Sequence, residues 1–111
     1  MKAAISMDEI ALNERAALFE GRRHGGGVSF FDVRFARGEG PPLHRHPYDE
    51  TFLVLEGTAR FTVGDETLEV GAGHVVVAPA GVTHAFVGAG DGVLHVVALA
   101  PTDRVVTEPV D

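Results

Sequence analysis

Hydrophobic and polar residues alternate along several short stretches of this chain, and such alternation is the pattern of β-strands with one buried face. Phe31, Val33 and Phe35 share one face of an extended segment, while Asp32 and Arg34 share the other. Because side chains on a strand point alternately to its two sides, this segment is expected to turn its aromatic face towards a core.

Short β-rich pieces of this kind recur between turns rich in glycine and proline. The segments predicted to be strands are Val28 to Phe35, Thr51 to Leu55, Ala59 to Val63, Thr67 to Val70, Val75 to Ala78, Ala85 to Val87 and Val93 to Leu99. Gly64-Asp65 predicts a tight hairpin. Many short strands with turn signals between them are typical of an antiparallel sandwich or barrel. The one helix candidate is Met7 to Phe19, where the apolar pattern is weak.

Composition narrows the class of protein. At 111 residues and 11.7 kDa the chain is expected to form one domain over residues 1–111, with a core at about 28–99 and terminal arms. A net charge of −7 and no basic stripe argue against nucleic acid as a partner. Because we find neither a signal peptide nor a run of ~20 apolar residues, we expect a soluble cytoplasmic protein rather than one bound to a membrane.

Histidines supply the candidate chemistry, because the chain has no cysteine and any metal must take nitrogen or oxygen ligands. His44 and His46 lie two residues apart, so on an extended segment they point the same way. Glu50 shares a strand face with Phe52, where a carboxylate is costly to bury unless it is paired or bound to a metal. His84 follows a second turn rich in glycine and proline. An isolated His-x-His pair is more often a surface feature than a pair of metal ligands. The pattern of the whole region therefore decides between the two interpretations.

That pattern resembles the cupin superfamily. A first motif, G-x5-H-x-H-x3,4-E-x6-G, is matched by Gly38, His44, His46, Glu50 and Gly57. A second, G-x5-P-x-G-x2-H-x3-N, is matched by Gly73, Pro79, Gly81 and His84, with Gly88 in place of the final Asn. In the family that Asn is not a ligand. The resemblance implies a jelly-roll β-barrel that binds one divalent metal (Fe, Mn, Ni, Cu, Co or Zn) through His44, His46, Glu50 and His84.

Other residues receive lesser roles. Phe52 and Phe86 share strand parity with Glu50 and His84, and we expect both rings to line the cavity beside the metal. Asp49 is expected to cap or orient a turn. His74 and His24 are expected to be exposed. His95 lies within an apolar strand; it is either a cavity residue or, the favoured reading, an ordinary packed or exposed strand histidine.

The resemblance leaves the reaction open. The leading hypothesis is a metal-dependent enzyme acting on a small organic molecule, an oxygenase, isomerase or cyclase, with oxidative chemistry favoured because the ligand set suits a redox metal. The alternative is a non-catalytic metal- or ligand-binding module that serves as a sensor or accessory protein. A homodimer is also expected, as the resemblance implies for small cupins, because a partner can cover the open sheet edges.

Overall fold

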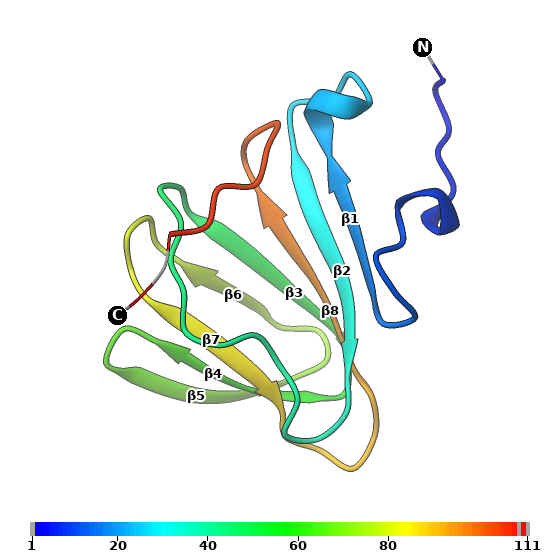
Figure 1. Ribbon diagram of the computed structural model, residues 1–111. Coiled ribbons are helices and arrows are strands. Elements are labelled where there is room, and N and C mark those ends of the chain that lie inside the picture. Colours follow the sequence, from blue (N-terminus) through cyan, green and yellow to red (C-terminus); the bar gives the residue numbers. More distant parts are fainter. Residues whose placement is uncertain (1, 109, 111) are drawn as a thin grey trace.

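Two antiparallel β-sheets make up the protein, as the computed structural model shows for residues 2–108 and 110 (Figure 1). The larger has five strands in the order β1-β2-β8-β3-β6, and the smaller has three in the order β5-β4-β7. The strands are β1 (Ala16–Glu20), β2 (Ser29–Phe35), β3 (Glu50–Glu56), β4 (Thr58–Val63), β5 (Glu66–Gly71), β6 (Val75–Ala78), β7 (His84–Gly88) and β8 (Leu94–Ala100). The predicted all-β architecture is confirmed. Among the described residues, no helix has the length and apolar character to cross a bilayer.

The core lies between the two sheets and is built by the predicted alternation. On β8, Leu94, Val96 and Ala98 are buried, while the residues between them are only partly buried. Phe61 from the small sheet stacks on Phe86 and contacts Phe52 from the large sheet edge to face, with centroid separations of 5.0 and 5.1 Å. Aromatic rings from both sheets therefore meet in one apolar layer.

The N-terminal helix prediction, Met7 to Phe19, is wrong. Residues Met7–Ile10 form a short 3-10 helix, η1, capped by Ser6, and Ala16–Glu20 form strand β1 at the edge of the large sheet. A second 3-10 turn, η2, covers Gly21–Arg23. The segment is a strand because its apolar side chains pack against partners on β2. Phe19 pairs with Phe30, and their stacked rings have centroids 5.2 Å apart. Tertiary pairing thus overrides a weak local pattern.

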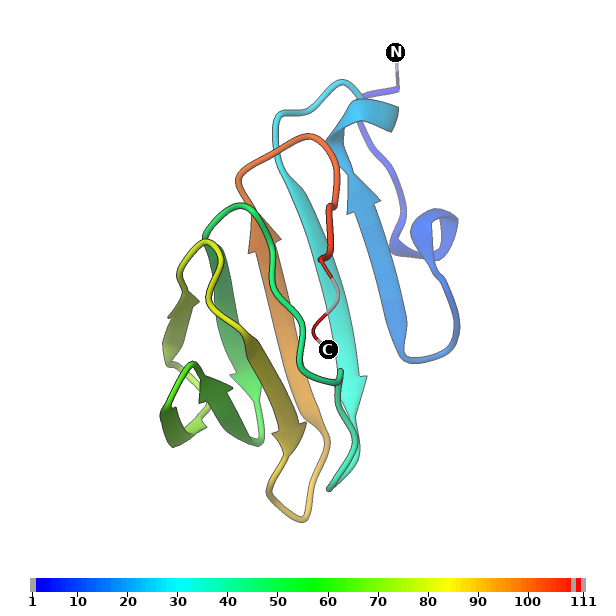
Figure 2. The ribbon, with the colours of Figure 1, turned by 60° about the vertical axis from the view of Figure 1, so that its left-hand side comes forward.

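The irregular stretch between β2 and β3 runs alongside β7, an edge strand of the small sheet. Gly38 donates a backbone hydrogen bond to the Gly88 carbonyl, and Gly88 in turn donates to the Glu39 carbonyl. At Gly40 the two chains come so close that a Cβ would lie 1.8 Å from the Phe86 carbonyl oxygen. Only glycine fits such an approach. In Figure 2 this green segment lies on the same side of the large sheet as the red C-terminal segment.

Candidate metal centre

The structure brings together the four side chains that the sequence motifs single out. One potential ligand atom from each of His44, His46, Glu50 and His84 lies within 4.8 Å of all the others. His46, Glu50 and His84 are only 2%, 4% and 1% exposed, and His44 is partly buried. A cluster of polar side chains this deeply buried requires compensating interactions.

The four residues come from three parts of the fold. His44 and His46 lie on the irregular segment before β3, Glu50 is the first residue of β3, and His84 is the first residue of β7. The large sheet thus contributes the carboxylate, and the small sheet contributes one imidazole. The turn before β7 is held by Asp49, whose Oδ1 accepts a hydrogen bond of 2.8 Å from the Ala80 amide, as predicted for a turn-orienting role.

All three imidazoles point the same nitrogen towards the centre of the cluster. The Nδ1 atoms of His44, His46 and His84 lie 2.7, 2.7 and 3.1 Å from the carbonyl oxygens of Pro42, Val106 and Val82, respectively. A carbonyl oxygen only accepts, so each Nδ1 carries the proton and each Nε2 presents a lone pair. This is the arrangement by which outer-shell partners orient histidine ligands of a metal.

Glu50 lies at the centre of the polar contacts. Its Oε1 lies 3.0 Å from His84 Nε2 and 3.3 Å from His46 Nε2. Burial alone would raise the pKa of Glu50, but the His46 and His84 imidazoles outweigh that effect and lower the pKa to about 2. The carboxylate is therefore ionised throughout the physiological range, as a metal ligand must be.

The histidine pKa values move in opposite directions. Burial lowers the pKa of His44, which favours the neutral imidazole. Burial also acts to lower the pKa of His46, but the neighbouring Glu50 carboxylate and the Val106 carbonyl outweigh it and raise that pKa. The negative charge of Glu50 therefore favours positive charge at His46, whereas burial disfavours it at His44.

One atom tests whether these residues suit a metal. His46 Nε2 is buried and makes no hydrogen bond with any residue in the described part of the chain. An orphaned buried nitrogen is rare in folded proteins and indicates an absent partner. The set of three imidazole nitrogens and one carboxylate matches divalent Fe, Mn, Co, Ni, Cu or Zn. The residues therefore fit the ion that the cupin motifs imply.

A cavity of about 360 Å³ opens beside the cluster. It is bordered by His44, His46 and Glu50, and otherwise mostly by apolar side chains: Leu12, Ala16, Phe31, Val33, Phe35, Pro41, Pro42, Phe52, Phe86, Ala98 and Thr107. Phe52 and Phe86, singled out from strand parity, both lie on its wall. The sequence did not point to Leu12 and Thr107, which come from the two terminal segments.

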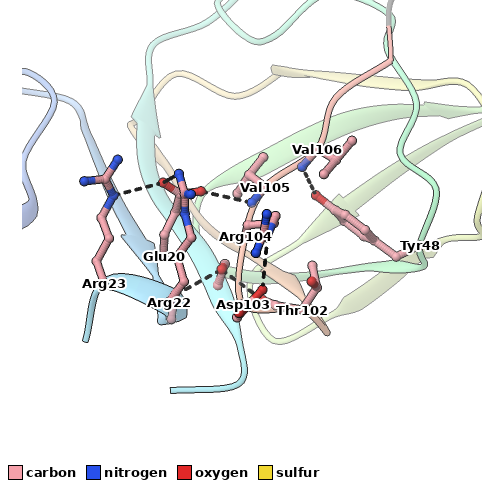
Figure 3. A network of polar contacts seen from close by, with 11 residues as sticks. Glu20, Arg22, Arg23, Tyr48, Thr102, Asp103, Arg104, Val105 and Val106 are labelled. Carbon is pink, nitrogen blue, oxygen red and sulfur yellow. Dashed lines mark hydrogen bonds and ion pairs between the residues drawn. The ribbon is translucent and has the colours of Figure 1, made fainter. Parts of the chain in front are cut away.

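The segment that follows β8 folds back to complete the site. Figure 3 shows how it is held: the Val105 amide donates to Glu20 Oε2 at 3.1 Å, and the Val106 amide donates to the Tyr48 hydroxyl at 3.2 Å. Tyr48 also stacks on His46 at a centroid distance of 5.0 Å. These contacts place the Val106 carbonyl against His46 Nδ1, and sequence reasoning missed this because a main-chain acceptor leaves no side-chain signature.

The remaining histidines lie outside the cluster. His74 is exposed, as predicted. His24 was expected to be exposed but is partly buried, because its ring stacks on Phe19 at 5.0 Å. His95 lies on the outer face of the large sheet, where its Nε2 and Asp32 Oδ1 are 3.0 Å apart. The favoured reading of His95 as an ordinary strand histidine is confirmed.

The fold is a two-sheet β-barrel, and the side chains of three histidines and one glutamate cluster inside it. The sequence pattern of the Cupin domain family matches residues 31–100. The chain therefore belongs to the cupin family. An uncharacterized protein of Streptomyces coelicolor is 51% identical over 41 residues, which cover 37% of this chain and 39% of that relative. The match thus spans well under half of the curated relative.

Solved structures show the same fold. Oxalate decarboxylase of Lactobacillus farciminis, solved as a formate complex, aligns with a TM-score of 0.80 at 20% identity, over 92% of this chain and 34% of its own. Bacillus subtilis oxalate decarboxylase, which has Mn(II) centres, aligns with a TM-score of 0.78 at 22% identity, over 86% and 28%. An RmlC-like cupin of Methanocaldococcus jannaschii aligns with a TM-score of 0.65 at 18% identity, over 69% of this chain and 72% of its own. This chain covers about a third or less of the decarboxylases.

Proposed function

We propose that the protein is a metal-dependent cupin enzyme, which holds one divalent transition metal with His44, His46, Glu50 and His84 and acts on a small organic molecule. The observation that carries this proposal is the buried, unpartnered Nε2 of His46 beside an ionised carboxylate. Such an ion supplies Lewis-acid or redox chemistry at the coordination positions that the protein leaves free. The Mn(II) centres of the decarboxylase with the same fold are consistent with a first-row metal.

The cavity explains why we favour an enzyme over a purely structural metal site. Structural metals are enclosed by protein ligands, whereas here three of the four ligand residues border an open space of about 360 Å³. Phe52 and Phe86 wall that space, exclude water from one side and hold an organic molecule against the ligand cluster. The protein thereby supplies position and a dry environment, and the reaction itself is proposed to be oxidative.

Oxygen consumption tests this function. Protein loaded separately with Fe(II), Mn(II) and Cu(II) is screened against small aromatic and aliphatic compounds, with uptake followed by an oxygen electrode. Glu50→Gln keeps the shape of the ligand and removes its charge, so turnover should fall with metal content. His74→Ala is the matched control, because His74 is exposed and lies outside the cluster. Ligand binding without turnover under any metal would favour the non-catalytic binding module instead.

We also infer that the protein forms a homodimer through the outer face of the large sheet. Val75 and Val77 on the edge strand β6 are 59% and 52% exposed, and Leu55 at the end of β3 is 52% exposed. Apolar side chains gathered on an edge strand invite pairing with another chain. A second copy related by two-fold symmetry would cover the same residues on both protomers.

A further inference from the structure

The cavity beside the ligand cluster has no Lys or Arg side chain among its described lining residues. The lining side chains outside the ligand cluster are apolar except for Thr107. Thr107 is exposed and belongs to the C-terminal segment, so its hydroxyl lies at the rim. Any charge that a ligand carries into this space must therefore be balanced at the metal or left unpaired.

The charge at the metal is small. A divalent ion with three neutral imidazoles and one carboxylate carries a net charge of +1, since +2 and −1 sum to +1. The cluster can neutralise one negative group of a ligand. A second anionic group would lie among phenylalanine rings without a partner, and burying an unpaired charge is strongly unfavourable.

One small residue lies between aromatic rings on the cavity wall. Ala98 on β8 pairs with Phe31 on one side and with Phe52 on the other, so a methyl group stands between two aromatic rings along the inner face. Phe35 on β2 and Phe86 on β7 meet edge to face at 5.8 Å, so this contact joins the two sheets along the cavity. At about 360 Å³ the space is at the small end of the range for ligand pockets.

We infer that the ligand is a small molecule with an apolar, preferably aromatic, body and a single metal-binding donor group that is neutral or singly charged. Dianions whose second carboxylate lies too far from the first to reach the same ion are excluded. This inference rests on the proposed metal site and specifies the substrate class of that same site.

The test is calorimetric titration of the Mn(II)-loaded protein with matched carboxylates at pH 7.5. Benzoate and acetate share the donor and differ in the apolar body, so benzoate should bind at least ~10-fold more tightly. Isophthalate adds a second carboxylate too distant to chelate the same ion, and it should bind at least ~10-fold more weakly than benzoate. Isophthalate or acetate binding as tightly as benzoate would overturn the inference.

Two variants of cavity residues and one control variant locate the effect. Thr107→Lys places a cation at the rim and should raise the affinity for isophthalate relative to benzoate several-fold, whereas Thr67→Lys, on the exposed β5 strand outside the cavity lining, should not change that ratio. Ala98→Leu fills the space between two rings and should weaken benzoate without affecting acetate. Equal effects of both lysine variants would count against the inference.

Metal content separates the two proposals. If elemental analysis finds no metal after reconstitution, the proposed function fails, and the inferred ligand class, which rests on the metal, fails with it. If the metal is present at one equivalent but isophthalate binds as well as benzoate, the metal site stands and the inferred ligand class fails.

Discussion

His44 and His84 are backbone partners: the amide of each donates to the carbonyl of the other, at 3.0 and 2.8 Å. This isolated antiparallel bridge joins the irregular segment to the small sheet and leaves the two imidazole rings 4.4 Å apart at their centroids. Two candidate ligands, 40 positions apart in sequence by their numbers, are thereby fixed by main-chain geometry. The ligand spacing consequently depends on the sheet rather than on flexible side chains.

Removal of a ligand should release the metal. His46→Ala and His84→Ala should each lower the affinity for a divalent first-row metal by more than ~100-fold, because loss of an outer-shell partner alone costs about 10–100-fold. Elemental analysis after dialysis measures the effect, with one equivalent expected for the wild type. His74→Ala should retain full metal content, and a wild type without metal after reconstitution with every candidate ion would refute the site.

Metal affinity should fall as the pH falls. A protonated imidazole cannot bind a metal, and the raised pKa of His46 extends its protonated form to higher pH than in free histidine. Glu50, with a pKa of about 2, stays ionised and does not compete with the metal between pH 5 and 8. We expect affinity to drop by about ten-fold per pH unit for each proton displaced, and the drop should begin above the pH of about 6.5 at which free histidine titrates, because the pKa of His46 is raised. Affinity that is constant from pH 7.5 to 5.5 would contradict histidine ligation.

The hydroxyl of Tyr48 should contribute to metal binding without touching the metal. Tyr48→Phe keeps the ring that stacks on His46 and removes the acceptor for the Val106 amide. The loss of one such hydrogen bond costs about 1 kcal/mol, and a looser Val106 carbonyl should weaken metal binding by up to ~10-fold. Isothermal titration with Mn(II) or Zn(II) measures this change. Unchanged affinity at reduced thermal stability would show that the segment supports the fold alone.

Phe52 and Phe61 are a matched pair of buried rings that distinguishes a role in lining the cavity from a role in packing the core. Both rings are almost fully buried, but only Phe52 lies on the cavity wall. Phe61→Ala should destabilise the protein by about 3–5 kcal/mol, the cost of a fully packed ring, and Phe52→Ala by less because its ring faces open space. Chemical denaturation gives these values. Phe52→Ala should also broaden the range of ligands bound, and equal losses with unaltered binding would assign Phe52 to packing alone.

Introducing a negative charge into the proposed dimer interface tests it. Val75→Glu and Val77→Glu should convert a homodimer to a monomer at micromolar concentration, because a buried unpaired carboxylate opposes association. Light scattering coupled to gel filtration measures the mass. Val93→Glu, an equally exposed valine in the turn before β8, is the control and should remain dimeric. A monomeric wild type at moderate salt would contradict the proposal outright.

Local alternation predicted most of the strands within one or two residues of their ends. Val75 to Ala78 coincides with β6, and Thr67 to Val70 falls one residue inside β5 at each end. The burial of Glu50 on the inner face of β3 also follows from its parity with Phe52. For these strands the period of the pattern carries the necessary information, although β3 pairs with β6 and β8, which lie far from it in the sequence.

Contacts made outside the segment itself account for what the sequence did not reveal. Strand β1 was missed because its apolar residues do not alternate with polar ones, and its partner β2 rather than its own propensity makes it extended. The rim residues Leu12 and Thr107 and the acceptor at Val106 reach the site only through the way both ends of the chain fold back. No spacing within a motif encodes these contacts.

The bond from His46 to the Val106 carbonyl joins positions 60 residues apart and has a consequence for the order of assembly. During translation His46 leaves the ribosome well before the segment behind β8 is made. Until that segment is made, His46 Nδ1 lacks the acceptor that turns Nε2 inwards in the folded protein. We therefore expect the nascent chain to capture its ion late, after the final strand has paired, so that loading reports completed synthesis.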